Sequence, residues 1–167
     1  MTVLEPTVPA GVPCRRLRLS PGPAAVGQAR ARVRAAVRDW QLPVSEGMAV
    51  LLTWDLVTSV TTEGPGGAIG TEGPAGPVVA HAGGGFLSLG ISAWRGRLRV
   101  DVYDGRRSLP ARGYEIVASL ADDWGIYRTP AGRAVFFTLA FTGAPATAAE
   151  RAAHRAPHRS LADTSAD

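Results

Sequence analysis

Two oxygen-bearing side chains lie one helical turn apart in an otherwise apolar stretch. Asp55 and Ser59 are spaced i, i+4, which places them on one face of the helix that is predicted there. A carboxylate can take a proton from a reacting group, and a hydroxyl beside it can donate or accept a hydrogen bond. The same pair is also compatible with the partly exposed edge of a helix that has no chemical role.

A second group of candidate residues follows a strand in which polar and apolar side chains alternate. This strand covers residues 98–103, and Asp104 ends it. A basic loop then leads to the turn Ala111-Arg112-Gly113-Tyr114 and to a short helix that ends Ala121-Asp122-Asp123-Trp124-Gly125. A strand, a loop, a helix and a hairpin can form a nucleotide lid, but the same layout is common in α+β proteins. Asp104 could simply end its strand, and Gly113 could be a structural turn.

In order and spacing, these motifs resemble the ATP-binding domain shared by histidine kinases, gyrase, heat-shock chaperones and mismatch-repair ATPases. The similarity is greatest to the small actinobacterial anti-sigma-factor serine kinases and covers roughly residues 14–141. In that family, a strand ends in an Asp, and a lid leads through Gly-Arg-Gly-Leu to a helix that ends Ala-Asp-x-Trp-Gly. The resemblance implies an α+β, histidine-kinase-like ATPase fold. We expect a two-layer sandwich with helices on one face of a mixed, mainly antiparallel sheet.

The resemblance also implies roles for individual residues. Asp104 would read the adenine amino group, Gly113 would be the second lid glycine, and Arg112 would lie where a phosphate could be met. The family's Glu-x-x-x-Asn segment corresponds to residues 55–59. Asp55 would therefore be the catalytic base and Ser59 the magnesium ligand, and ATP and magnesium are the implied cofactors.

Several of these ligand positions depart from the family pattern. Ser59 replaces the magnesium-binding Asn, Asp55 replaces a longer Glu, and Ala111 replaces the first lid glycine. Glu115 adds a negative charge where an apolar residue is usual, and such a charge would repel phosphates. The positions that form the fold are intact. This drift therefore favours a scaffold that binds proteins, with ATP and magnesium bound weakly or not at all.

Three functions are compatible with these observations. The first is a regulatory protein of the anti-sigma type that binds a sigma factor or an anti-sigma antagonist and has weak or lost nucleotide binding. A homodimer is compatible with this function. The second is an active ATP-dependent serine/threonine kinase that phosphorylates such an antagonist. In this case Asp55 and Ser59 would still suffice as the catalytic base and the magnesium ligand. The third is an unrelated α+β binding module.

Arginines mark two candidate protein-binding surfaces. One is a face of the helix predicted over residues 24–40, where arginines recur at i, i+4, and the other is the lid, residues 105–112. Guanidinium groups suit carboxylate partners, and we expect few acids beside these arginines on the two surfaces. A merely solvated helix face is the alternative. The residues concerned are Arg30, Arg34, Arg38, Arg106, Arg107 and Arg112.

Composition limits the other functions. The 167 residues suffice for one domain with a real core, 46% of them are hydrophobic, and the net charge is +4. The 18 basic residues, all of them Arg, are interspersed with acids, and the sequence has no basic–aromatic strip of the RNA-binding type, so we expect no nucleic-acid partner. No apolar run is long enough to cross a membrane, the first residues do not resemble a signal peptide, and Cys14 is the only cysteine. We therefore expect a cytoplasmic protein without a membrane partner.

The periodicity of apolar residues predicts the elements that position these groups. We expect an edge strand over residues 15–20 and a second helix that starts at Ser45-Glu46. A hairpin should join residues 86–95 to the strand that begins at Leu98, and two more strands should cover residues 124–128 and 134–141. In the second helix, the buried residues are predicted to be Met48, Leu51, Leu52, Leu56 and Val60. In the short helix after the lid, they are predicted to be Ile116, Val117 and Leu120.

Three stretches are predicted to lie outside the folded core. Residues 1–13 should be loose, and residues 142–167 should form a disordered tail because they lack an apolar stripe. Residues 64–85 are rich in Gly and Pro and contain a near-repeat, which is typical of a flexible insertion. The sequence thus predicts a single domain over residues 14–141.

Overall fold

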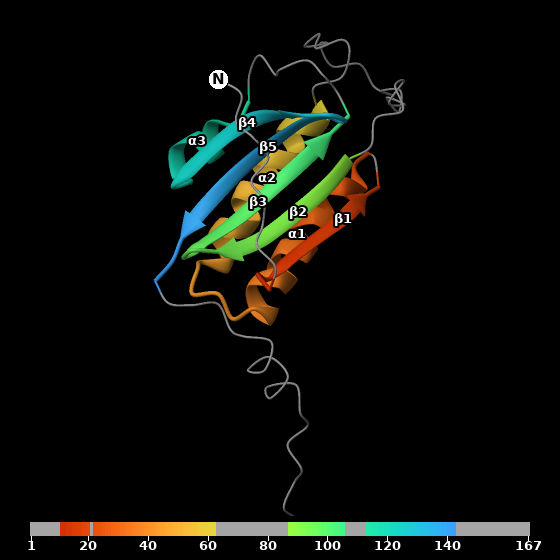
Figure 1. Ribbon diagram of the computed structural model, residues 1–167. Coiled ribbons are helices and arrows are strands. Elements are labelled where there is room, and N and C mark those ends of the chain that lie inside the picture. Colours follow the sequence, from red (N-terminus) through yellow and green to blue (C-terminus); the bar gives the residue numbers. More distant parts are fainter. Residues whose placement is uncertain (1–10, 21, 63–86, 106–112, 143–167) are drawn as a thin grey trace, which may run out of the picture.

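The protein forms an α+β sandwich of two layers, a sheet with helices on one of its faces (Figure 1). A computed structural model describes residues 11–20, 22–62, 87–105 and 113–142. The five strands run in the order β1-β2-β3-β5-β4, and every pairing between them is antiparallel. The predicted α+β class, the two layers and the position of the helices on one face are confirmed. The expected mixed sheet is not found, because all pairings among the described strands are antiparallel.

Helices α1 and α2 form a hairpin behind the sheet. Helix α1, Ala24–Asp39, ends where the Trp40 backbone N–H donates to the carbonyl oxygen of Ala36. Helix α2, Glu46–Thr62, starts after Ser45, whose hydroxyl oxygen accepts the Met48 N–H at 3.2 Å. This bond satisfies one of the N–H groups that have no partner within the first turn of a helix.

The sheet is built around a tight central hairpin. Strand β2, Leu87–Trp94, is followed by β3, Arg97–Asp104, and the turn residues Arg95 and Gly96 both have positive φ angles. Two positive φ values are typical of the two-residue turns that match the twist of an antiparallel hairpin. Strand β1, Cys14–Leu19, pairs with the outer edge of β2.

The remaining elements complete the opposite edge of the sheet. Helix α3, Glu115–Leu120, contacts α2 and β4. Strand β4, Asp123–Thr129, pairs with β5, Gly132–Ala140, which in turn pairs with β3. The element order is therefore the one that the sequence predicts.

The main core lies between the sheet and the helices. It takes every second residue of each strand, because side chains alternate across a sheet, together with the inner faces of α1 and α2. Its fully buried members include Val33, Leu52, Leu56, Leu89, Ile91, Leu98, Val100, Val102 and Phe137. This core fixes the relative positions of α2, β3 and β5, the elements that carry the candidate residues.

Two predicted core residues lie at the surface instead. Leu51 of α2 is 39% exposed and Leu120 of α3 is 45% exposed, so both predictions are wrong. Helix α2 is apolar around most of its circumference, and the residues that reach the sheet are Ala49, Leu52, Leu56, Val57 and Val60. Leu51 points away from that face because it lies about 100° from Leu52 around the helix axis.

Some predictions concern residues outside the part of the chain that the structure describes. These are the insertion over residues 64–85, almost all of the predicted tail over residues 142–167, most of the loose start over residues 1–13, and the lid residues Arg106, Arg107 and Arg112. Within the described residues, no helix has both the length and the apolar character needed to cross a membrane.

Candidate functional site

Asp55 holds helix α3 against helix α2. Its side-chain oxygen Oδ2 accepts the backbone N–H of Val117 at 3.0 Å, and the residue is 8% exposed. Val117 is the third residue of α3, where an N–H has no partner within the helix, and Tyr114 at the N-cap makes no side-chain capping bond. The carboxylate of Asp55 therefore caps α3 from a distant part of the sequence, as an N-cap side chain normally does from within the helix.

Ser59 lies directly against the turn that precedes α3. The backbone of Gly113 has a φ of 106°, and a Cβ atom added there would lie 3.1 Å from both the Cβ and the Oγ of Ser59. Only glycine adopts this conformation readily and leaves that space empty. The structure thus brings Asp55, Ser59 and Gly113 together at the contact between α2 and α3.

Asp104 has a buried partner in the neighbouring strand. It lies opposite Arg133 in the β3–β5 register, and Arg133 Nη2 donates to Asp104 Oδ2 at 3.2 Å. The residues are 5% and 1% exposed. Burying either charge alone would cost several kcal/mol by order of magnitude, so each needs the other. Sequence reasoning missed Arg133, although an arginine within the apolar run of β5 was a signal for such a pair.

These positions form two separate sets of contacts in the described structure. Asp55, Ser59 and Gly113 adjoin α3, while Asp104 is paired with Arg133; Arg112 lies outside the described residues. Among the residues that the structure describes, no group of three or more His, Cys, Asp or Glu side chains could hold a metal ion. A role for Ser59 in binding magnesium stays a prediction that rests on the resemblance alone.

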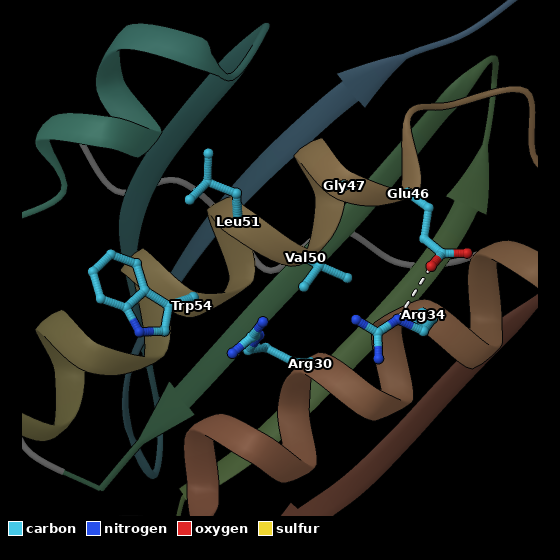
Figure 2. A pocket seen from close by; sticks show the side chains of 7 residues that line it. All are labelled: Arg30, Arg34, Glu46, Gly47, Val50, Leu51 and Trp54. Carbon is cyan, nitrogen blue, oxygen red and sulfur yellow. Dashed lines mark hydrogen bonds and ion pairs between the residues drawn. The ribbon is translucent and has the colours of Figure 1, made fainter.

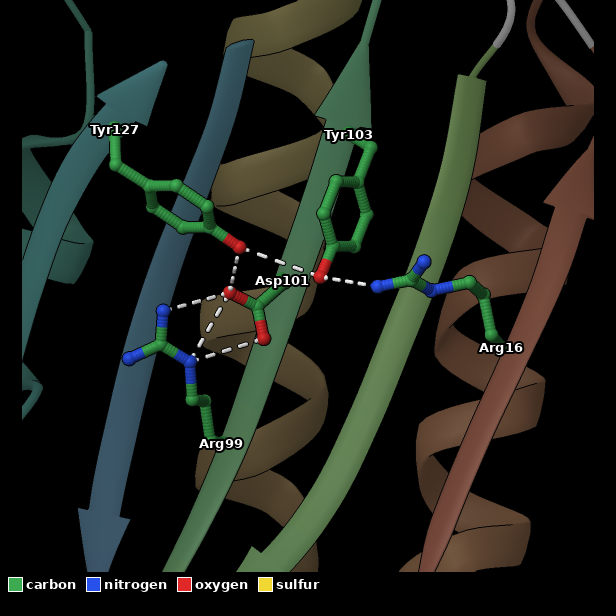
Figure 3. Close-up of polar contacts among 5 residues, drawn as sticks. All are labelled: Arg16, Arg99, Asp101, Tyr103 and Tyr127. Atoms are coloured by element: carbon green, nitrogen blue, oxygen red, sulfur yellow. Dashed lines mark hydrogen bonds and ion pairs between the residues drawn. The ribbon is translucent and has the colours of Figure 1, made fainter. Parts of the chain in front are cut away.

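The sheet face opposite the helices carries a polar network that sequence reasoning did not identify (Figure 3). At its centre, Asp101 accepts three hydrogen bonds from Arg99. Nη2 donates to Oδ1 at 2.8 Å, and Nε donates to Oδ2 at 3.0 Å and to Oδ1 at 3.1 Å. The Tyr127 hydroxyl donates to Asp101 Oδ1 at 3.0 Å. Asp101 is 6% exposed and Tyr127 is 2% exposed. The alternation of Arg99, Asp101 and Tyr103 along β3 was the available signal.

Aromatic rings and a second arginine extend this network across the sheet. Arg99 lies 3.7 Å from the ring centroid of Phe136, and Arg16 from β1 lies over the Tyr103 ring and donates to its hydroxyl at 2.9 Å. A Cβ at Gly90 would lie 3.1 Å from the Tyr103 ring, so glycine makes room for the ring there. Cation–π contacts and charge-assisted hydrogen bonds of this kind hold β1, β3, β4 and β5 together on the face without helices.

Burial changes the protonation behaviour of this network. Burial raises the pKa of the Asp101 carboxyl, against the opposing effects of the hydrogen bonds from Arg99 and Tyr127. The pKa of Tyr127 is also raised, first by burial and then by the negative charge of Asp101. Tyr127 therefore remains a hydrogen-bond donor at neutral pH, and the network has the character of a structural brace.

A hollow of about 500 Å³ lies between α1 and α2 on the outside of the helical layer (Figure 2). At one end, Glu46 contacts Arg34 at 3.1 Å and Arg38 at 2.6 Å. The expectation that few acids adjoin this arginine face is therefore wrong for Arg34 and Arg38. Glu46 begins the following helix, and the tight α1–α2 connection brings it back beside α1. The lining residues are Arg30, Arg34, Glu46, Gly47, Val50, Leu51 and Trp54.

Comparisons with known proteins do not place the chain in a family. No protein-family model matches it, and no curated protein matches it. The family suggested by the motifs around residues 55–59, 104 and 111–125 therefore stays a prediction.

Proposed function

We propose that this chain is a regulatory protein of the anti-sigma type, built on a histidine-kinase-like ATPase scaffold, which acts by binding another protein. The observation that carries the proposal is the capping bond from the Val117 N–H to Asp55. In a working kinase of the resembled family, the residue at this position would orient the attacking hydroxyl and take its proton. Here its carboxylate has a structural task inside the fold.

Two further observations support weak or lost nucleotide binding. Asp104, which the resemblance assigns to adenine, forms a buried ion pair with Arg133. An adenine amino group would have to compete with a guanidinium for this carboxylate, and charge-assisted hydrogen bonds are roughly twice as strong as neutral ones. Ser59 offers a hydroxyl where the family offers an amide oxygen, so magnesium would be held poorly.

In this proposal, the partner is a sigma factor or an anti-sigma antagonist, and the protein works in the cytoplasm. The element order supports the scaffold, since a strand, two helices, a hairpin, a helix and a hairpin follow one another as the resemblance implies. Arg30, which is exposed on the outer face of α1 and has no ion pair among the described residues, supports a protein partner that carries carboxylates.

Calorimetry with ATP, in the presence and absence of magnesium, tests the loss of nucleotide binding. We expect no binding in the micromolar range and no gain on adding magnesium. The matched variant is Asp104→Asn, which weakens the pair with Arg133 and should not create a magnesium-dependent signal. Micromolar, magnesium-dependent binding by the unmodified protein would contradict the proposal.

A phosphate-transfer assay tests the kinase alternative. The protein is incubated with radiolabelled ATP, magnesium and candidate antagonist proteins, and we expect no labelled product. The control is Asp55→Asn, because an asparagine oxygen can still accept the Val117 N–H while the amide cannot serve as a base. Label that appears on an antagonist with the unmodified protein, and not with Asp55→Asn, would establish the kinase.

A further inference from the structure

The hollow between α1 and α2 has the composition of a protein-binding site. Trp54 and Leu51 are 40% and 39% exposed, and they are spaced i, i+3 on α2, so they form one apolar strip. Gly47 lies one turn before Leu51, and a Cβ placed there would meet only the Ser45 hydroxyl at 3.9 Å, which leaves the floor of the hollow open. Tryptophan and arginine, here Trp54 and Arg30, are among the residue types most enriched at the positions that carry most of the energy of an interface.

The charged residues that line the hollow indicate the sign of the charge that a partner segment would carry. Glu46 is shared between Arg34 and Arg38, whereas Arg30 forms no ion pair with any residue that the structure describes. Figure 2 shows the Arg30 side chain on the same open side of the helices as Trp54. Asp39, the acid at the end of α1, is paired with Arg15. A carboxylate on a partner would therefore find a guanidinium beside an apolar strip.

The shape of the hollow indicates the kind of segment that fits. Helices α1 and α2 are joined by a short connection and pack against each other as antiparallel neighbours, and residues of both helices line the hollow. A third helix can pack into the groove between two neighbouring helices, with its apolar side chains at i, i+3, i+4 and i+7 facing that groove.

Resting on the function proposed above, we propose that the α1–α2 groove receives an acidic, amphipathic helix of the partner protein. The apolar side chains of that helix lie on Leu51 and Trp54, and one of its carboxylates pairs with Arg30. Arg34 lines the same groove and donates to Glu46 Oε1 at 3.1 Å.

Three synthetic peptides of equal length serve as probes of the groove. The first is an amphipathic helix with Leu on one face and Glu on the other, the second has Lys in place of Glu, and the third has the first peptide's composition in an order without an apolar face. We expect the first to bind the full chain at least about tenfold more tightly than the other two, as measured by fluorescence anisotropy. Equal affinities, or tighter binding of the basic peptide, would overturn the proposal.

Matched variants locate the binding. We expect Arg30→Glu and Trp54→Ala to weaken the first peptide about tenfold. Arg32→Glu makes the same change of charge at another exposed position of α1, and Trp124→Ala removes another exposed tryptophan, 37% exposed. Both controls should change the affinity by less than about threefold. If the controls weaken binding as much as the groove variants do, the peptide binds elsewhere and the proposal fails.

Cross-linking in the native cell tests the partner itself. A photo-reactive amino acid replaces Leu51 in the full chain. The control position is Leu120 on α3, which is 45% exposed compared with 39% for Leu51. The captured segment, identified by mass spectrometry, should be acidic, amphipathic and part of another protein. A segment of a second copy of this chain, a nucleic acid, an extended segment, or no product specific to position 51 would overturn the proposal. A partner protein captured only from other positions would refute this site but leave protein binding as the function. Magnesium-dependent ATP binding, measured separately by calorimetry, would refute the proposed function itself.

Discussion

Asp55 is a residue at which structural and chemical roles can be separated by mutation. Replacing it with Ala removes the acceptor for the Val117 N–H and leaves a buried donor without a partner. We expect Asp55→Ala to lower the free energy of unfolding by about 1–2 kcal/mol, the usual cost of losing a helix cap. Asp55→Asn should retain most of that stability, because its amide oxygen can accept the same bond.

Urea unfolding followed by circular dichroism measures this difference. Asp123→Ala, at an exposed position of β4, is the control and should stay within about 0.5 kcal/mol of the unmodified protein. An Asp55→Ala variant as stable as the unmodified protein would mean that the bond to Val117 contributes nothing, and the structural role of Asp55 would have to be given up.

The buried ion pair of Asp104 and Arg133 should also contribute to the free energy of unfolding. Removing one member leaves the other charge buried and uncompensated, so Asp104→Ala should cost about 3–5 kcal/mol. Replacing both residues together, Asp104→Leu with Arg133→Met, should recover much of that loss because no charge remains buried. Thermal and denaturant unfolding of the two variants provide the comparison. If the double variant were less stable than Asp104→Ala, the two charges would not depend on each other as described.

At the scale of the elements, the polar network on the sheet face responds to alkaline pH. The folded-state pKa of Tyr127 lies above its value in the unfolded chain, where a tyrosine titrates near 10. Above that pH, the unfolded chain loses a proton that the folded protein keeps, so stability falls as the pH rises. Below it, both states hold the proton and the contribution is fully present.

Unfolding in urea at a series of pH values between about 8 and 11 tests this pH dependence. We expect the stability of the unmodified protein to decline above about pH 10, and that of Tyr127→Phe to decline less steeply, because phenylalanine has no proton to lose. Parallel curves for the two proteins would show that Tyr127 does not titrate on unfolding.

The elements could be predicted where each carries its own pattern. Helix α1 has one apolar stripe, and β2 and β3 alternate around the Arg95–Gly96 turn, so their existence, order and approximate bounds follow from the residues. Helix α2 could not be oriented in the same way. Leu51 and Trp54 lie on its outer side and Leu52 and Leu56 on its inner side, and periodicity selects a buried face only where the other face is polar.

Contacts between distant side chains were beyond the sequence for a different reason. The bonds of Asp55 with Val117 and of Asp101 with Tyr127 join elements whose relative position is set by the packed core and by strand register. No local pattern marks a carboxylate as the cap of a remote helix. The sequence could therefore identify Asp55 as an unusual residue, but not the group that it meets.

At the scale of the whole molecule, the two faces differ in what they leave available. On the sheet face, the polar groups of Asp101 and Tyr127 are buried and bonded to one another. On the helical face, Leu51 and Trp54 remain exposed beside Arg30. A partner gains more by covering apolar surface than by displacing hydrogen bonds that are already made, so the helical face is the better candidate for association.

The position of β1 has a consequence for the order of folding events. The partners Cys14 and Ser92 are separated by both long helices and by the residues that join α2 to β2, whereas β2 and β3 are joined by the two residues Arg95 and Gly96. Closing a long loop costs more entropy than closing a short one, and contacts that are distant in sequence slow folding. The sheet should therefore grow outward from the central hairpin, with β1 added after the rate-limiting step.

Stopped-flow measurements of folding and unfolding rates separate these two stages. Gly96→Ala strains the hairpin turn, where φ is 70° and a Cβ would lie 2.9 Å from the Phe141 carbonyl oxygen, so it should mainly slow folding. Leu17→Ala weakens the packing of β1 and should mainly speed unfolding. The opposite assignment would place β1 in the folding nucleus. If the expected order holds, the last strand to join is also the first to leave, and Arg16 is the arginine that locks it onto the finished sheet through Tyr103.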